Sequence, residues 1–307
     1  MTLAPDLMGA LNPVGSASAG DPARFLAVHQ HPDVWLVVGA LAVGYWWAVS
    51  RLGPKLVPRG QEVVSRRMVV WWYSGVALLW IFAEWPIHDL AEHYSYGIHM
   101  TEHLVFTLVC APMMLLGMPG WMLRWIVVGR PWYGFVRFVC RPVPALLLNS
   151  GVLLATHWPS LVNTTTHNEW IHFGVHLVLF TSSLALFMPV INRIPELPRL
   201  TKPAKILYLF LQSMAPIPPT LWLIYSQTVL YTAYLPGTAY LGWSATGDQE
   251  VAGSLMGAVT PIMLWILAAV LFFSWWAEEE RRNATTLPDD LTWDDVVREL
   301  DAQPDRG

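Results

Sequence analysis

Charged residues are scarce in this chain of 307 residues, because aspartate, glutamate, lysine and arginine together make up only 13% of it. That share is about half of what a soluble domain usually carries. Hydrophobic residues make up 54% of the chain, and the mean hydropathy is +0.41. The net charge of −4 comes largely from the tails, so it says little about nucleic acid or an acidic partner, and we expect no nucleic-acid partner. The composition predicts a polytopic membrane protein in contact with the lipid bilayer.

Cysteine is also scarce, and a cleavable leader is not evident. Cys110 lies in an apolar segment and Cys140 in a basic loop, so the two cysteines form neither a disulfide framework nor a paired metal motif. Residues 1–33 lack the basic start and early apolar core of a signal peptide. We therefore expect residues 1–33 to be an irregular leader outside the membrane.

Long apolar runs follow the leader, each close to the length of roughly 17 to 25 residues that a membrane-spanning helix needs. They predict an all-α bundle of seven transmembrane helices within residues 34–276, followed by a charged cytoplasmic tail at 277–307. The predicted spans are 34–50, 68–84, 98–119, 143–159, 170–190, 206–228 and 250–276. Residues 121–128 are apolar but short and contain Arg124, which favours a helix at the membrane interface over an eighth span.

Basic residues alternate with the spans. They gather between spans one and two, three and four, and five and six, and again in the tail, whereas Arg24 is the only basic residue on the other side. Basic loops remain in the cytoplasm during insertion. The pattern predicts an outer N-terminus and a cytoplasmic C-terminus.

With this topology all ten histidines fall on the outer side. His99 and His103 open the third span and His172 and His176 open the fifth, so each pair lies on one helix face at similar depth. Ionisable side chains in a membrane segment are costly and mark functional sites. His157, at the outer end of span four, lies near the same level. We expect four others to be solvated: His29, His31, His93 and His167.

Two residues of span seven flank this histidine layer. Asp248 begins the span, and Met256 lies about 12 Å further in by helical rise. Asp248 is a candidate ligand or only a helix cap, and Met256 is a candidate ligand or only core packing. In span six, three prolines within residues 215–219 must break the helix, which is tolerated where the backbone lines a cavity or packs on protein.

Three kinds of site compete for these residues. Imidazole suits zinc and copper, and a thioether shifts the preference to Cu(I), so copper is favoured. Haem held by one histidine from each helix is the alternative, which would make the chain a membrane haem protein or oxidoreductase. The sequence His99-Met-Thr-Glu-His103 also fits H-x-x-E-H, the inverted motif of zinc peptidases, but a further carboxylate ligand and room for a peptide are not evident. The residues alone predict an outward-facing metal or cofactor cavity.

Three ordered blocks of the sequence resemble the CtaG-type cytochrome c oxidase assembly proteins of bacteria, which are seven-span membrane proteins. The blocks are His99-Met-x-x-His103-Leu with Ala111-Pro112 and Gly117-Met-Pro119, then His157-Trp-Pro159 with His172-x-x-x-His176-Leu, then Asp248-Gln249-x-x-Ala252-Gly253-x-x-Met256 with Trp276-Ala-Glu-Glu-Glu-Arg-Arg282. The resemblance covers roughly residues 30–283. Glu102 stands where the family often has glutamine, and it adds a further candidate ligand or proton acceptor.

The resemblance implies a role in the maturation of a haem-copper oxidase. We expect a non-enzymatic copper chaperone or insertion factor whose partners are a cytochrome c oxidase subunit or its copper donors. Cu(I) would be held by three or four of His99, His103, His172 and His176. His157, Asp248 and Met256 would serve as auxiliary or transfer ligands.

Overall fold

The computed structural model describes residues 31–166, 168–286 and 293–302, and within these residues it contains helices and connecting segments but no β-strand. The first helix within the described residues, α2, begins at Pro32. Nearly all of the predicted leader, together with His29 and His167, therefore lies outside the described residues. The all-α prediction is confirmed for the part of the chain that is described.

The α-helices and shorter helical turns follow one another without long gaps. Their bounds are α2 Pro32–Trp47, η2 Ala48–Leu52, α3 Gly53–Leu56, α4 Arg66–Ala83, α5 Ile87–His93, α6 Tyr96–Leu104, η3 Val105–Cys110, α7 Ala111–Gly117, α8 Gly120–Val127, α9 Tyr133–Val139, α10 Pro142–Thr156, α11 Pro159–Thr165, α12 Glu169–Ile191, α13 Lys202–Ser213, α14 Ile217–Tyr225, η4 Thr232–Tyr234, α15 Leu235–Tyr240, α16 Ala245–Thr286 and α17 Trp293–Asp301.

Five helical segments in the described residues are long and apolar enough to cross a membrane, and the number rises to seven if each of two bent helix pairs is one span. The bent pairs are α4 with α5, at 50°, and α9 with α10, at 80°. Each of the seven predicted apolar runs falls on one of these segments or pairs. The chain is thus a polytopic helical membrane protein with five to seven spans.

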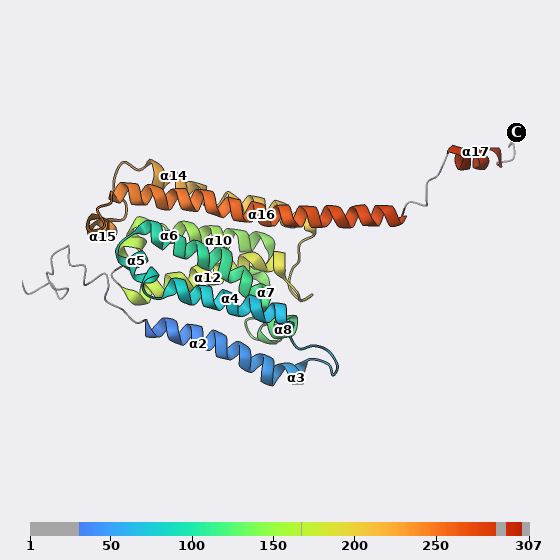
Figure 1. Ribbon diagram of the computed structural model, residues 1–307, viewed down its shortest axis with the longest axis horizontal. Coiled ribbons are helices and arrows are strands. Elements are labelled where there is room, and N and C mark those ends of the chain that lie inside the picture. The colour runs from blue at the N-terminus through green and yellow to red at the C-terminus, as the bar shows by residue number, and fades with distance from the viewer. Residues whose placement is uncertain (1–30, 167, 287–292, 303–307) are drawn as a thin grey trace, which may run out of the picture.

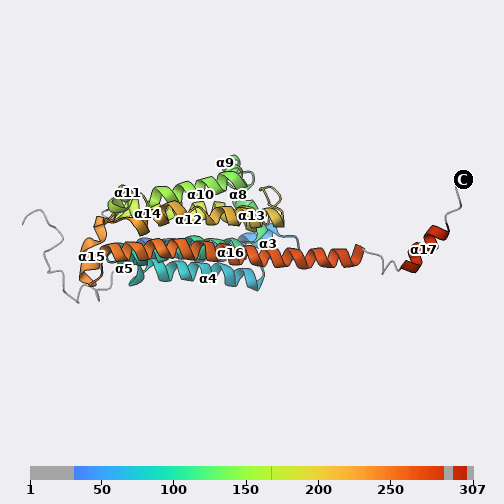
Figure 2. The same ribbon diagram turned by 90° about the horizontal axis from the view of Figure 1, so that it is seen from above.

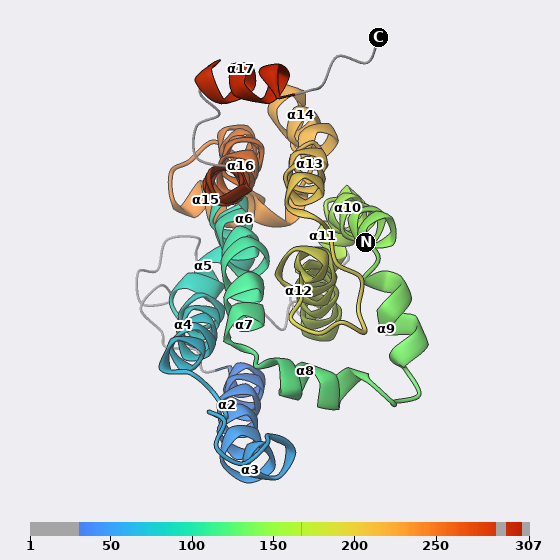
Figure 3. The same cartoon turned by 90° about the vertical axis from the view of Figure 1, so that its right-hand side faces the viewer.

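The helices form an elongated bundle (Figures 1 and 2). The long helix α16 packs along α6, α13 and α14, while α12 packs against α7 and α10. Seen end-on, α6, α7 and α12 lie near the middle of the bundle and α2 lies at its edge (Figure 3). The two helices that carry the histidine pairs, α6 and α12, thus lie near the middle of the bundle, and each buries about half of its span.

Two of the crossing segments are irregular near the site. The prolines predicted to break span six do so, because α13 ends at Ser213 and α14 begins at Ile217. Between α6 and α7, residues Val105–Cys110 form the π-helical turn η3, directly after His103. Such π-turns often occur at functional sites, since they rotate side chains out of the α-helical register.

The ends of the bundle differ in chemistry. Helices α5 and α15 lie at one end and α3 and α8 at the other (Figure 1). The short helix predicted at residues 121–128 is observed as α8, and its Arg124 forms an ion pair of 2.5 Å with Glu196. Arg193 donates a hydrogen bond of 2.8 Å to the carbonyl of Leu116 at the same end. The end with α5 holds the histidines instead.

Candidate metal centre

The first histidine pair lies at the start of α6. Ser95 caps this helix, since its hydroxyl accepts a hydrogen bond from the backbone N–H of Ile98 at 3.2 Å. Four residues separate His99 from His103, so their rings lie on one face, with centroids 4.2 Å apart. Both side chains are buried.

The second pair lies at the start of α12 in the same way. Asn168 caps the helix by accepting hydrogen bonds of 3.1 Å from the backbone N–H groups of Trp170 and Ile171. The rings of His172 and His176 stack, with centroids 4.4 Å apart. The capping asparagine therefore fixes where α12 begins and with it the depth of this pair.

The two pairs meet. The ring centroids of His99 lie 5.6 Å from His172 and 5.8 Å from His176, and those of His103 and His176 lie 4.8 Å apart. Ligand nitrogens of His99, His103 and His176 all lie within 4.8 Å of one another. The predicted four-histidine layer is thus present as one cluster, which we call the histidine cluster: His99, His103, His172 and His176.

Most ring nitrogens of the histidine cluster have no hydrogen-bond partner, although solvent cannot reach them. These atoms are Nδ1 of His99, both nitrogens of His103, both nitrogens of His172 and Nε2 of His176. A buried polar atom without a partner costs about 1–3 kcal/mol, so such atoms are rare in folded proteins. Six such nitrogens on four adjacent rings indicate that the cluster is a binding site for a ligand.

His157 lies at the end of α10, next to the cluster. Its Nδ1 is 2.6 Å from the carbonyl oxygen of Leu153, which makes Nδ1–H the donor and leaves the lone pair on Nε2. That Nε2 is buried without a partner. The ring centroids of His157 and His103 are 6.3 Å apart. The structure therefore brings His157 beside the cluster, as the sequence predicted.

Tyr231 fixes the backbone at this point. Its hydroxyl donates a hydrogen bond of 2.8 Å to the carbonyl of His157. Burial raises the pKa of Tyr231 to about 12, so the hydroxyl stays protonated at neutral pH and remains a donor. The position of the His157 ring is thus set by a contact from the segment that precedes α15.

Met256 also reaches the site. It is buried in α16 and lines a cavity of about 40 Å³ together with His103 and His157. The same cavity is lined by Met100 of α6. A thioether therefore lies next to the histidine cluster, at the place where span seven was predicted to supply one.

Asp248 has a different set of contacts. Its carboxylate accepts hydrogen bonds from the hydroxyl of Ser95 at 2.5 Å, from the N–H of Tyr96 at 2.7 Å and from the N–H of Gly97 at 3.3 Å. The alternative that Asp248 caps its own helix is wrong, since Ser244 accepts the N–H of Gly247 there. Asp248 instead caps α6, because an anionic side chain is favourable at a helix N-terminus. No contact joins it to the histidine cluster within the described residues.

We expect Asp248→Ala to lower the free energy of unfolding by about 2–3 kcal/mol, since a buried charged acceptor with three donors is removed. Asp248→Asn keeps one acceptor oxygen and should be milder. Thermal unfolding of both variants in detergent would measure the difference. Loss of copper affinity in Asp248→Asn without loss of stability would instead identify the carboxylate as a ligand.

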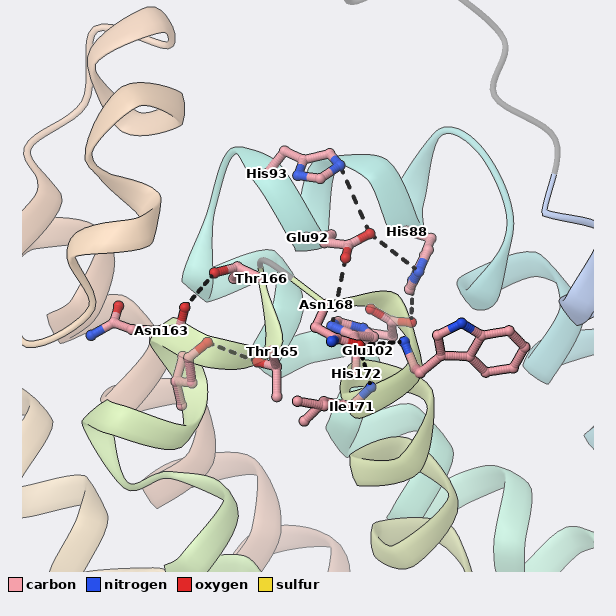
Figure 4. A network of polar contacts seen from close by, with 12 residues as sticks. His88, Glu92, His93, Glu102, Asn163, Thr165, Thr166, Asn168, Ile171 and His172 are labelled. Carbon is pink, nitrogen blue, oxygen red and sulfur yellow. Dashed lines mark hydrogen bonds and ion pairs between the residues drawn. The ribbon is translucent and has the colours of Figure 1, made fainter. Parts of the chain in front are cut away.

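A second group of ionisable residues covers the cluster. The sequence indicated Glu102 as a candidate ligand or proton acceptor and put Glu92, which precedes span three, near the mouth of the site, but it gave no role to His88. In Figure 4, Glu92 of α5 points toward three histidines, His88, His93 and His172. The oxygen-to-nitrogen distances are 3.8, 3.8 and 3.7 Å. Glu102, which is completely buried, lies 2.9 Å from Nδ1 of His88 through its Oε1. The site therefore combines the histidine cluster with two carboxylates and a fifth imidazole.

The sequence also indicated that His88 and Glu92 lie together. His88 and Glu92 are four residues apart and share a helix face, but that spacing does not show which helix they face. His31 was expected to be solvated, and this is wrong. Its Nε2 lies 3.2 Å from Oδ2 of Asp89, and its ring packs edge-on against His88 at 5.0 Å. His93 is more than half exposed, as expected.

The chain was compared with known proteins. The family model described as the cytochrome c oxidase caa3 assembly factor matches residues 43–278, a range that contains both histidine pairs, His157, Asp248 and Met256. Comparison with curated proteins and with solved structures finds no match. A match over well over half of the 307 residues shows that the chain belongs to the family of cytochrome c oxidase caa3 assembly factors.

Proposed function

We propose that the protein is a non-enzymatic assembly factor that binds Cu(I) on the outer side of a bacterial plasma membrane and delivers it to a haem-copper cytochrome c oxidase. Copper is the cargo in this proposal. The histidine cluster holds it, with His99, His103 and His176 as the primary ligands because their nitrogens already lie within 4.8 Å of one another. His172 completes the set.

One observation carries the proposal, namely the six buried ring nitrogens without partners. In the metal-free protein these atoms have lost their contact with water and gained nothing in return. A metal ion bound among them would restore an interaction to each nitrogen that faces it. Binding of Cu(I) is then favoured because it gives these buried nitrogens a partner.

The donor set favours Cu(I). Imidazole and thioether ligands select this ion, whereas a closed zinc site generally uses thiolates. Neither cysteine belongs to the group of candidate ligands in the described residues, since Cys110 packs with Ala83 and Phe106, and Cys140 packs in the core cluster that contains Leu186 and Leu209. The two carboxylates, Glu92 and Glu102, supply negative charge close to the cation.

The two other kinds of site find less support. Two imidazoles that hold a haem iron enclose a porphyrin between them, but the cluster rings are 4.2 to 5.8 Å apart and the adjoining cavity is only about 40 Å³. A zinc peptidase needs Glu102 beside an open substrate cleft, whereas Glu102 is fully buried and bound to His88. The geometry of the histidine cluster favours a small ion over a haem or a peptide substrate.

The membrane orientation belongs to the same proposal. The end of the bundle with Arg124 and Arg193 faces the cytoplasm, since basic loops stay on that side. The histidine cluster then opens to the outer side, where we expect a subunit of the oxidase or its copper donors to dock. Reporter fusions to the C-terminus, active only in the cytoplasm, would test this orientation.

The proposal is tested by the metal and haem content of the detergent-purified protein after anaerobic loading with Cu(I). We expect tightly bound copper and no Soret absorbance. His93→Ala is a matched control, because this histidine is exposed and lies outside the cluster. A Soret band without copper would support the haem alternative, and the absence of both after loading would leave a purely scaffolding role.

A further inference from the structure

The cavity beside the histidine cluster has a composition of its own. Its volume is about 40 Å³, and its walls come from α6, α10, α12, α13 and α16. Its lining includes His103, His157, Met100 and Met256, and the other polar residues that line it are Thr107, Asn149, Ser183, Gln212 and Thr260. A cavity needs about 10–15 Å³ for each water molecule, so this one accepts an ion or about three waters.

The ring nitrogens of His103 and His157, which line the cavity, can bind a cation. The bond from His157 to the Leu153 carbonyl fixes the tautomer, so the unpartnered Nε2 carries a lone pair. His103 supplies two further unpartnered nitrogens. Two imidazoles that ligate one ion from opposite sides have ring centroids about 6 Å apart, since each metal–nitrogen bond is about 2 Å long. The observed separation of 6.3 Å fits that arrangement.

Two thioethers complete the donor set. Met100 and Met256 are almost completely buried, and both line the cavity. Methionine in an apolar core is ordinarily packing. Here the two methionines line the same cavity as His103 and His157, whose ring nitrogens lack partners. A donor set that mixes imidazole and thioether selects Cu(I) over divalent ions.

We propose that this cavity is a second Cu(I) site, held by His103, His157 and Met256 with Met100 as a further thioether donor. The site rests on the function proposed above, in which the histidine cluster binds the first ion. The ion remains Cu(I) throughout, so no electron or proton donor is needed for its movement between the two sites.

His103 connects the two sites. Its ring centroid is 4.8 Å from His176 in the cluster and 6.3 Å from His157 across the cavity. A neutral imidazole has one lone pair and therefore binds one ion at a time. His103 binds an ion with His99 and His176, or turns to the cavity and leaves His99, His172 and His176 as the outer site. An ion can then pass between the sites without being released to water.

Three other polar residues that line the cavity form hydrogen bonds with one another, namely Asn149, Ser183 and Gln212. Gln212 donates a hydrogen bond of 2.9 Å to Oδ1 of Asn149, and Asn149 donates one of 3.3 Å to Ser183. The Oε1 of Gln212 remains buried without a partner. This oxygen can accept a hydrogen bond from a water that shares the cavity with the ion. Water alone is the competing occupant.

The test is an anaerobic titration of the metal-free protein with Cu(I) against a chelator, together with X-ray absorption of the loaded protein. We expect two equivalents in the parent, with a sulfur scatterer appearing at the second. The double variant Met100→Leu/Met256→Leu should lose the sulfur signal and weaken the second equivalent by about 100-fold or more. Leucine is close to methionine in volume, so the fold should persist. Met114→Leu is the matched control, since Met114 is buried in another cluster.

A second variant separates this site from the cluster. His99→Ala/His172→Ala/His176→Ala leaves His103, His157 and both methionines, so it should retain one equivalent with sulfur ligation. One equivalent in the parent, unchanged in the methionine variant, would overturn the second site and leave the histidine cluster intact. Two equivalents without sulfur would also overturn it, because the second ion would then lie elsewhere. No binding in the parent would instead refute the proposed function.

Discussion

Replacing His99, His103, His172 and His176 together with leucine is expected to abolish high-affinity Cu(I) binding and, at the same time, to stabilise the metal-free protein. The loss of binding removes the ligands themselves. The gain of stability, about 1–3 kcal/mol, follows because buried nitrogens without partners are replaced by apolar groups. Unfolding of the parent with and without Cu(I) gives the reference, and at a thousandfold excess over Kd the ion should stabilise it by about 4 kcal/mol.

His93→Leu is the control for this experiment, because it removes an exposed histidine that touches only the edge of the site. It should change neither the metal-free stability nor the copper-dependent increase by more than about 0.5 kcal/mol. If the four-leucine variant keeps the copper-dependent increase, the ligands lie elsewhere. If it is less stable than the parent without metal, the nitrogens have structural partners, and the central support for copper binding is lost.

The meeting of the two histidine pairs was predictable because it depends on quantities that the sequence contains. Spacing of four residues sets the face of each pair, and distance from the start of an apolar run sets its depth. The rings of His103 and His176 therefore lie 4.8 Å apart although 73 residues separate them. His157 was predictable for the same reason, since it ends an apolar run on the same side.

The contacts of residues that follow a bend in the chain could not be predicted from spacing and depth. Helix α5 turns by 50° from α4, and this turn carries Glu92 over the histidine cluster. Hydropathy counts apolar residues and contains no information about the direction of the chain after a break. Asp248 shows the same difficulty, because its donors Ser95 and Tyr96 lie about 150 residues away and belong to the N-terminus of another helix. The seven apolar runs were found for the opposite reason, since each needs only local composition.

The second large effect on stability is expected when Glu102 is replaced. This side chain is completely buried, its Oε1 is bound to His88 at 2.9 Å, and its Oε2 has no partner. Glu102→Ala leaves His88 without its acceptor inside the protein, and removing one member of a buried pair costs about 3–5 kcal/mol of stability. Thermal unfolding of Glu102→Ala, His88→Leu and the double variant would measure the coupling between the two residues. If the losses of stability in the two single variants add up to the loss in the double variant, the pair does not act as a unit.

Glu102→Gln separates the charge of this residue from its hydrogen bond. The amide oxygen still accepts the N–H of His88, so we expect only a small loss of stability. The negative charge disappears, however, and His88 lies beside the histidine cluster, with its ring centroid 5.4 Å from His172 and 6.1 Å from His176. Because Glu102 acts on the cluster only through the neighbouring His88, we expect its loss to weaken Cu(I) binding by about 10-fold, the lower end of the loss for carboxylates bonded directly to metal ligands, which chelator competition would detect. Equal affinity in Glu102→Gln and the parent would mean that Glu102 does not contribute to binding, which leaves Glu92, whose Oε1 lies 3.7 Å from Nδ1 of His172, as the carboxylate that balances the cation.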